Sequence, residues 1–318
     1  MNSQINVLEK IETQSIISSS LPSLVGNTPL LPLEKIEQHL NPQVSLYAKA
    51  EWFNPSGSVK DRPALNIILE ALERGEFSEG QHLLDSTSGN MGIAYATFGA
   101  TLGIPVTLIL PSNASKERIQ ILEALGAELI LTDPLEGTDG AIKKAMQLSK
   151  QEPGRYFYAN QYDNPNNWKA HYQTTGPEIL QQTGQSITHF VAGLGTSGTL
   201  TGVARYLRQN LPQIEIIGVQ PDGPLHGVEG LKHMASAIQP GIYDPTTPDR
   251  IIHVSTEESY RMVRRLAREE GYFVGVSSGS AAVAALRVAE ELDRGNIVTI
   301  FPDAGFKYLS DEELWKES

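Results

Sequence analysis

Short apolar segments alternate with amphipathic segments from about residue 44 to residue 301, and this rhythm limits the fold more than any other feature. Several of the apolar segments lack polar residues almost entirely, as strands covered by helices on both faces do. The segments between them carry helix signals, with Pro63 before one apolar stripe and Gly75 after it. Ser115 and Gly126 similarly mark the start and the end of a helix predicted between them. The segments that we interpret as strands are 44–49, 82–85, 106–110, 128–132, 156–159, 189–192, 214–219 and 297–301.

Strands that alternate with helices form mostly parallel sheets with crossover helices, so the predicted fold class is α/β. The length of 318 residues is typical of one large domain or of two ordinary domains. The rhythm breaks between residues 223 and 250, which are rich in Pro, Gly and Asp, and we expect a long ordered loop there. Residues 311–318 are charged around one Trp, which indicates a short, loose helix.

The composition narrows the range of partners. The chain carries 25 basic and 37 acidic residues, a net charge of −12, and no cysteine. These values exclude disulfides and thiolate chemistry, and they argue against nucleic acids and anionic membranes as partners. No signal-peptide pattern opens the sequence and no apolar run approaches the roughly 20 residues that span a bilayer. We therefore expect a cytoplasmic protein that binds small molecules or other proteins.

A glycine-rich segment follows the strand predicted at 189–192. Gly193–Gly198 matches the dinucleotide-binding pattern, and Asp222 lies where a ribose-binding acid is expected, which makes NAD one interpretation. The hydroxyl groups of Thr196, Ser197 and Thr199 suit a terminal phosphate equally well. From these residues alone the choice between a dinucleotide and a phosphate monoester stays open, and a tight turn without a ligand is the third interpretation.

Three further junctions carry polar residues. Gly275–Gly279 has the spacing of a hydrolase nucleophile elbow, but the last histidine, His253, precedes it, which excludes that order of residues. Asp85–Asn90 combines hydroxyl groups, an amide and backbone N–H groups that suit a carboxylate. Lys60 stands at the start of a helix, where the dipole disfavours a cation, and such a position suits a lysine that forms a Schiff base. The scattered histidines predict no metal site.

Together, these segments resemble the cysteine synthase (O-acetylserine sulfhydrylase) family of fold type II pyridoxal-phosphate enzymes. The resemblance runs from Leu24–Leu30 through Asn54–Arg62, Thr87–Asn90 and Gly195–Thr199 to Asp303–Ser310. It implies two domains, each a mostly parallel twisted sheet flanked by helices, as in the tryptophan synthase β subunit. The smaller, mobile domain would span residues 46–164, and the larger would combine 1–45 with 165–318.

The resemblance also implies a role for each motif residue. Pyridoxal 5′-phosphate is the implied cofactor, and Lys60 is the catalytic lysine that binds its aldehyde. The other implied cofactor-binding residues are Asn90, Gly195, Thr196, Ser197, Gly198, Thr199 and Ser277. The implied substrate-binding residues are Thr87, Ser88, Gly89, Met91 and Gln161, and no metal is implied.

The implied reaction is β-replacement on an O-activated L-serine, O-acetylserine or O-phosphoserine, by a sulfur nucleophile, which gives L-cysteine through an aminoacrylate. The implied partners are the amino-acid substrate, a sulfur donor and a second copy of the chain in a homodimer. Serine acetyltransferase and a thiocarboxylated carrier protein are further candidates. The alternatives are a cystathionine β-synthase-like reaction with a thiol, an NAD-dependent oxidoreductase, and a docking partner of serine acetyltransferase.

Two segments depart from the family pattern. Met91 stands where the family usually has Thr, and the ending 303–310 resembles the branch that uses O-phosphoserine and a carrier protein. However, the loop Gln220–His226 lacks the arginine with which that branch binds the substrate phosphate. The sequence therefore does not decide between acetate and phosphate as the leaving group.

Overall fold

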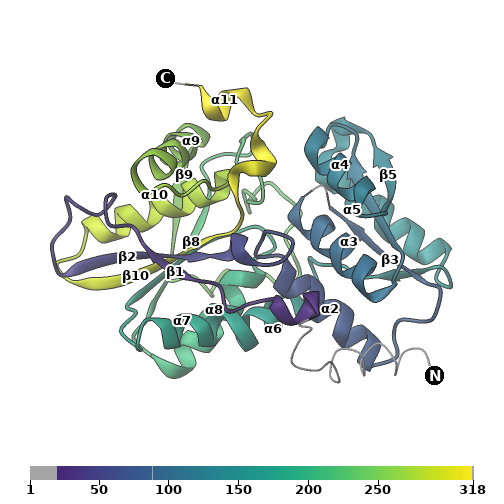
Figure 1. Cartoon of the computed structure of the whole chain (residues 1–318), viewed down its shortest axis with the longest axis horizontal. Helices are drawn as coiled ribbons and strands as arrows, with labels where there is room; N and C mark the ends of the chain where they lie inside the picture. The colour runs from purple at the N-terminus through teal and green to yellow at the C-terminus, as the bar shows by residue number, and fades with distance from the viewer. Residues whose placement is uncertain (1–19, 88, 317–318) are drawn as a thin grey trace. The chain divides into compact units, whose positions relative to one another are not determined.

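The computed structural model describes residues 20–87 and 89–316, and the chain divides into two compact units. Within the described residues, unit 1 takes in the chain up to Val25 together with Asn54–Asn167. Unit 2 takes in Gly26–Phe53 and the chain from Trp168 onward. Figure 1 labels the elements of both units. Two units with parallel sheets and flanking helices confirm the predicted α/β fold.

Unit 1 contains a four-stranded sheet in the order β5-β4-β3-β6, and all of its strand pairs are parallel. Its strands are β3 (His82–Ser86), β4 (Val106–Pro111), β5 (Glu128–Thr132) and β6 (Tyr156–Tyr158). Its helices are η1 (Leu21–Leu24), α2 (Asp61–Glu73), α3 (Asn90–Leu102), α4 (Lys116–Ala124), η3 (Pro134–Glu136) and α5 (Gly137–Gln151).

Alternate residues of the central strands of unit 1 point into two separate cores. Leu83 and Leu108 pack with α2, α3 and α4, whereas Leu84 and Ile109 pack with α5. This alternation follows from the pleat of a strand, which sends successive side chains to opposite faces. The sheet is therefore covered on both sides, as the apolar segments of the sequence predict.

Unit 2 contains a six-stranded sheet in the order β1-β2-β10-β7-β8-β9, in which only the β1–β2 pair is antiparallel. Its strands are β1 (Leu30–Pro32), β2 (Val44–Ala50), β7 (His189–Gly193), β8 (Glu215–Pro221), β9 (Arg250–Val254) and β10 (Gly295–Phe301). Its main helices are α7 (Gly176–Gln182), α8 (Gly198–Asn210), α9 (Thr256–Arg265) and α10 (Val276–Glu290). Shorter helical segments are η2 (Glu51–Phe53), η4 (His171–Thr175), η5 (Leu266–Glu270), η6 (Gly305–Tyr308) and α11 (Glu312–Trp315).

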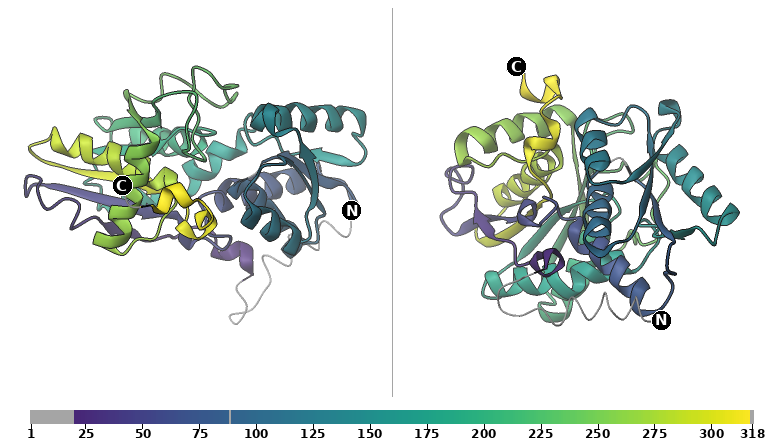
Figure 2. Two further views of the ribbon diagram at one scale, coloured as in Figure 1. Left: turned by 90° about the horizontal axis from the view of Figure 1, so that it is seen from above. Right: turned by 45° about the vertical axis from the view of Figure 1, so that its right-hand side comes forward.

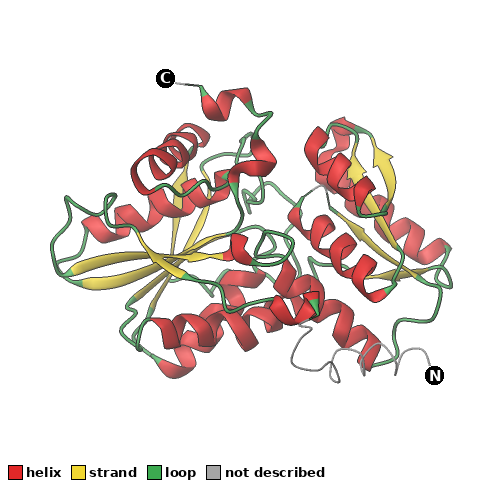
Figure 3. Cartoon of the chain, viewed as in Figure 1, coloured by secondary structure: helices red, strands yellow, loops and turns green. Residues whose placement is uncertain are grey.

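Helices cover both faces of the sheet in unit 2. α9 and α10 lie on one side and α7 and α8 on the other, as the colouring by secondary structure shows (Figure 3). The same layering can be followed within each unit in the two further views (Figure 2). The side of α9 and α10 holds the core that includes Val191, Ile217, Ala285 and Ile297. No helix in the described part of the chain has the length and apolar character needed to cross a membrane.

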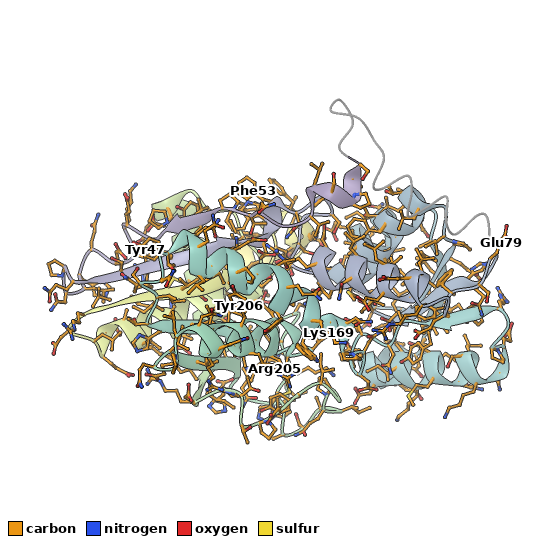
Figure 4. All side chains as sticks on the ribbon, turned by 90° about the horizontal axis from the view of Figure 1, so that it is seen from below. Tyr47, Phe53, Glu79, Lys169, Arg205 and Tyr206 are labelled. Carbon is orange, nitrogen blue, oxygen red and sulfur yellow. The ribbon has the colours of Figure 1, made fainter. Side chains whose placement is uncertain are left out.

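Close backbone packing holds α8 against the segment that precedes α7. A Cβ atom on Gly202 would lie 2.2 Å from the carbonyl oxygen of Trp168, so only glycine permits this approach. The Arg205 guanidinium lies 4.1 Å from the centre of the Trp168 ring, and the Tyr172 and Tyr206 rings meet edge to face. Figure 4 labels Arg205 and Tyr206 on this helix. This contact positions the first turn of α8.

The domain boundaries differ from the predicted ones. The predicted boundary between residues 45 and 46 falls inside β2, which pairs with β10 from Val44 to Ala50 and so belongs wholly to unit 2. After β2 the chain returns to unit 1 at Asn54 and leaves it after Asn167, three residues later than the predicted end at 164. Residues 20–25 also group with unit 1 instead of the larger domain. Sheet pairing, which local sequence patterns do not reveal, accounts for these differences.

The secondary structure agrees with the predicted strands and shows two more. All eight predicted strands are present, and the described residues contain two further strands, β1 and β9, which lie at the two edges of the sheet in unit 2. Residues 222–249 form neither helix nor strand, which confirms the long loop. α11 forms one turn at the charged end, and residues 317–318 lie outside the described residues.

Candidate functional site

Lys60 occupies the position directly before α2, at the end of a tight loop in unit 1. The loop turns at Gly57, whose φ is +80°, and the Gly57 N–H donates to the Asn54 carbonyl oxygen at 2.8 Å. The buried Asp61 carboxylate accepts from the Ser56 N–H at 2.6 Å and also from the Ser56 hydroxyl. A carboxylate in the first turn of a helix is favourable because of the helix dipole. Asp61 therefore fixes the loop and with it the backbone of Lys60.

The polar loop after β3 begins at a sheet strand and ends at the start of α3. The Thr87 N–H donates to the Ile109 carbonyl oxygen at 2.9 Å, and the Thr87 hydroxyl accepts from the Gly89 N–H at 3.2 Å. A Cβ atom on Gly89 would meet no atom within 4 Å, so space lies open beside this residue. Such a junction presents backbone N–H groups to an anion. Ser88, also predicted here, lies outside the described residues.

Met91 does not extend this polar surface. Its side chain is 1% exposed and packs in the apolar core that α2, α3 and α4 share with the sheet. Only its backbone is left to contribute to ligand binding at the loop. The Met91 thioether is therefore part of the apolar interior of unit 1.

Gln161 lies beside the same loop, although it follows Asn90 by 71 positions in the sequence. The Gln161 side-chain amide donates to the Ser86 backbone carbonyl oxygen at 3.1 Å. The backbone carbonyl oxygen of Gln161 accepts from the side-chain amide of Asn167 at 2.7 Å. β3 and β6 are parallel neighbours, so the segments that follow them meet at one edge of the sheet. Unit 1 thus brings together the predicted residues Thr87, Gly89, Asn90 and Gln161.

A buried carboxyl group, Asp85, lies under these residues. One oxygen accepts from the Ser86 N–H at 2.8 Å and the other from the Gln161 N–H at 3.2 Å. Burial raises the pKa of Asp85 to about 7, although the two N–H groups pull the pKa in the opposite direction. Burial also raises the pKa of the neighbouring Tyr95 phenol well above its ordinary value. The sequence pattern includes Asp85 in the polar segment 85–90 but predicts no separate role for it.

In unit 2, the glycine-rich segment joins β7 to α8. A Cβ atom on Gly195 would lie 2.2 Å from the Gly230 carbonyl oxygen, so the loop backbone lies directly against the segment around residue 230. Ser197 adopts the left-handed conformation at φ +67°, directly before the first residue of α8. Its hydroxyl is buried and has no hydrogen-bond partner among the described residues. An unpartnered buried hydroxyl beside a helix N-terminus is the arrangement that an anion such as phosphate completes.

Two threonines border this cradle. The Thr196 hydroxyl accepts from the Gly198 N–H at 3.3 Å. The Thr199 hydroxyl lies 3.2 Å from Nε2 of His171, whose Nδ1 lies 2.9 Å from the Thr175 hydroxyl. The buried His171 was expected only as a core or surface residue, because nothing near it in sequence links it to α8. It orients Thr199 from the neighbouring η4 segment.

Ser277 lies in the first turn of α10, and its side chain is 6% exposed. The residue before the helix, Gly275, donates its N–H to the Asp303 carbonyl oxygen at 3.0 Å, just after β10. A Cβ atom on Gly275 would lie 2.1 Å from the Asp303 carboxylate. Because β10 and β7 are parallel neighbours, the start of α10 and the glycine-rich loop lie at the same edge of the sheet in unit 2.

The chemical groups at these positions match the groups of pyridoxal phosphate, which carries a phosphate, a ring nitrogen and an aldehyde. Unit 2 provides a glycine-lined anion cradle with an unpartnered hydroxyl, and the neutral Ser277 lies at the same edge of its sheet. Unit 1 provides the amine of Lys60. The described residues contain no group of three or more His, Cys, Asp or Glu side chains that could hold a metal ion.

Comparison with known proteins agrees with this reading. Residues 21–303 match the family model described as pyridoxal-phosphate dependent enzyme. A cysteine synthase of Aquifex aeolicus is 53% identical over 292 residues, which cover 90% of this chain and 89% of the relative. The crystal structure of a cysteine synthase from Entamoeba histolytica has a TM-score of 0.89 at 37% identity and covers 96% of this chain and 95% of that one. An O-acetylserine dependent cystathionine beta-synthase from Helicobacter pylori has a TM-score of 0.87 at 36% identity, over 93% and 98% of the two chains.

These matches remove the NAD-dependent alternative, because the glycine-rich segment belongs to a pyridoxal-phosphate enzyme along most of the chain. Asp222, the predicted ribose-binding acid, is exposed after β8. The chain belongs to the cysteine synthase family of pyridoxal-phosphate dependent enzymes.

Proposed function

We propose that this protein makes L-cysteine by β-replacement on an O-activated L-serine, with sulfide as the sulfur donor. The observation that carries the proposal is the 53% identity to a cysteine synthase over nine-tenths of the chain. The polar cluster of unit 1 and the anion cradle of unit 2 support it, because the reaction needs a carboxylate-binding surface and a phosphate-binding surface.

The proposed cofactor contacts follow from the donor groups. The N–H groups and hydroxyls of Gly195–Thr199 would hold the phosphate, with His171 keeping the Thr199 hydroxyl in place. Asn90 would lie beside the ring oxygen, Ser277 would face the ring nitrogen, and Nζ of Lys60 would bind the aldehyde carbon. Once bound, pyridoxal phosphate supplies the electron sink that stabilises negative charge at Cα of the substrate.

The protein groups then carry the proton and exclude water. Thr87, Gly89, Asn90, the backbone of Met91 and Gln161 would bind the substrate carboxylate. Nζ of Lys60 would take the proton from Cα while the activated oxygen leaves Cβ, and it would return the proton to Cα after sulfur has bonded to Cβ. We expect binding of the carboxylate to bring the loop before α3 over the substrate, so that the loop excludes water as a lid does.

The leaving group is proposed to be acetate. The loop Gln220–His226 contains no lysine or arginine that could pair with a substrate phosphate. A thiol nucleophile is the second candidate, because a cystathionine beta-synthase is among the similar structures. The oligomer is proposed to be a homodimer, and light scattering that gives the mass of a single chain would contradict it.

The test compares substrates on one preparation. The holoenzyme is assayed for product with O-acetylserine or O-phosphoserine, each combined with sulfide or homocysteine. The proposal expects cysteine from O-acetylserine and sulfide as the fastest reaction, and loss of that rate in Lys60→Ala. Borohydride reduction and peptide mapping should place the pyridoxyl group on Lys60. A pyridoxyl mass on a different lysine, or faster turnover with homocysteine, would contradict the proposal.

A further inference from the structure

Asp85 is a buried carboxyl group that has no cationic partner among the described residues. Its side chain is fully buried, and its two oxygens accept hydrogen bonds from backbone N–H groups, at 2.8 Å from Ser86 and at 3.2 Å from Gln161. The Tyr95 phenol also faces the carboxyl group. Burying a carboxyl group without an opposite charge costs free energy. A residue that served only to fill the core here would be apolar, so the carboxyl group has a use that offsets this cost.

The two donors belong to the two halves of the carboxylate-binding surface. Ser86 leads directly into Thr87 and the loop before α3, and Gln161 follows β6. The Gln161 side chain bridges back to the Ser86 carbonyl oxygen at 3.1 Å. Asp85, Ser86 and Gln161 thus form a closed set of hydrogen bonds that ties the two segments together. The buried Ser86 hydroxyl, which has no partner among the described residues, lies within this set.

We propose that Asp85 is the positioning residue that holds Thr87, Gly89 and Asn90 in register with Gln161 for the carboxylate of the amino-acid substrate. The inference rests on the proposed function, because it takes that surface to be the substrate carboxylate site. Asp85 itself is covered, so it acts through the two backbone segments and not by contact with substrate.

The ionised form is the one that can accept from both N–H groups at once. Burial raises the pKa of Asp85 to about 7. Asp85 therefore changes between its protonated and its ionised form close to neutral pH. The groups that face it are the phenols of Tyr95, Tyr158 and Tyr162 and the carboxylate of Asp163. Burial raises the pKa of each phenol above its ordinary value, so the phenols stay neutral there and Asp163 is the charged neighbour.

Asp85→Asn is the informative substitution because it keeps the shape and removes one of the two acceptors. The asparagine oxygen can accept from one N–H only, and its NH2 group opposes the other. We expect the KM for O-acetylserine to rise about tenfold or more, as a small misplacement of binding groups does, while the KM for sulfide and the cofactor affinity stay near those of the wild type. Asp85→Glu, which keeps the charge, should recover part of the loss. Asp133→Asn, at an exposed turn of the same unit, is the matched control.

A second measurement isolates the carboxylate from turnover. Binding of L-alanine and of L-alaninamide, which lacks the carboxylate, is followed by the change in cofactor absorbance. The wild type should prefer alanine, and the preference should grow between pH 6 and pH 8. Asp85→Asn should lose both the preference and its dependence on pH.

The outcomes separate this inference from the proposed function. Wild-type enzyme that makes no cysteine refutes the proposed function, whereas active wild type with an unchanged alanine preference in Asp85→Asn refutes the role of Asp85. A loss of cofactor affinity and melting temperature in both Asp85→Asn and Asp85→Glu, without a selective change in carboxylate binding, would also refute it, because that pattern marks a merely structural residue.

Discussion

At the scale of single residues, the glycine-rich loop of unit 2 depends on two glycines that have no side chain. Gly195 lacks the Cβ that would collide with the Gly230 carbonyl oxygen, and Gly193 lacks the Cβ that would collide with the Leu231 side chain. The collision at Gly195 is with backbone, which cannot rotate away as a side chain can. These close approaches restrict the backbone of the loop, in which the Ser197 hydroxyl has no hydrogen-bond partner among the residues that the structure describes.

Gly195→Ala should weaken cofactor binding without unfolding the chain. The added methyl group would lie 2.2 Å from the Gly230 oxygen, so the loop must shift away from the anion position. We expect the dissociation constant of pyridoxal phosphate, measured by absorbance titration, to rise about tenfold or more. Gly154→Ala, at a site where a Cβ meets nothing within 4 Å, is the control. Equal affinities in both variants would contradict the cradle.

Asp85 makes stability depend on pH with a definite sign. Its folded pKa is about 7, and its unfolded pKa is near 3.9. Between these values the folded state keeps a proton that the unfolded state has lost, so the free energy of unfolding falls as pH rises and levels off above the folded pKa. Asp85→Asn removes this slope, which amounts to at most about 1.4 kcal/mol per pH unit.

The measurement is urea unfolding of wild type and Asp85→Asn at intervals from pH 5 to pH 8. The advantage of wild type over the variant should shrink as pH rises to about 7. An advantage that stays constant, or grows, over this range would show that the folded state does not hold the proton.

At the scale of elements, helix ends set where the active groups lie, and the sequence signals for these ends differ in quality. α9 begins with a complete capping box, in which the Ser255 hydroxyl accepts from the Glu258 N–H and the Glu258 carboxylate accepts from the Ser255 N–H. α4 begins with Ser115, whose hydroxyl accepts from the Arg118 N–H at 3.4 Å and has no reciprocal bond. The helices at the site, α3 and α8, have no side-chain cap, which leaves their N-termini available to anions.

Ser255→Ala should destabilise unit 2 more than Ser115→Ala destabilises unit 1. Loss of a cap costs about 0.5 to 2 kcal/mol, and the reciprocal bond puts Ser255 toward the upper end. Chemical unfolding followed by fluorescence and by hydrogen exchange of the two helices gives the comparison. A larger loss for Ser115→Ala would mean that the capping box adds nothing to α9.

At the scale of the whole molecule, the chain passes between its two units near residues 25, 53 and 167, and a buried polar cluster lies next to these points within unit 2. Nζ of the fully buried Lys49 donates to the Thr28 carbonyl oxygen and to the Glu178 carboxylate, both at 2.6 Å, and to the Gln182 side chain at 2.9 Å. The cluster thus ties the segment that enters unit 2 to β2 and α7.

Lys49→Met keeps the length of the side chain and removes its charge. The Glu178 carboxylate then loses the opposite charge of Lys49 in a partly buried place, and breaking a buried ion pair from one side costs about 3 to 5 kcal/mol. Arg74→Met, which breaks the exposed pair with Glu70, should cost about 0.5 kcal/mol or less. Unfolding free energies of the intact holoenzyme test both. Similar losses for the two variants would contradict a structural role for the Lys49 cluster.

The periodicity of apolar residues was enough to predict eight of the ten strands of the described residues. The polar junctions marked candidate binding segments, and the resemblance to the cysteine synthase family implied the roles of Lys60, Thr87–Asn90, Gly195–Thr199 and Ser277, which stay predictions. The periodicity and the junctions are local, because a strand alternates at every second residue and a helix start needs its donors within a few residues. Local rules also apply before any long-range contact forms. That is why the fold class could be predicted without a structure.

Only the tertiary structure decided which of these segments meet. The packing of strands and helices places Gln161 beside Ser86, His171 beside Thr199 and Lys49 beside Glu178, across 75, 28 and 129 residues of sequence. The pairing of β2 with β10 assigns the whole of β2 to unit 2 and so moves the domain boundary to residue 53. A polar side chain looks alike in sequence whether it faces solvent or a distant partner, because burial and pairing arise from how the sheets assemble.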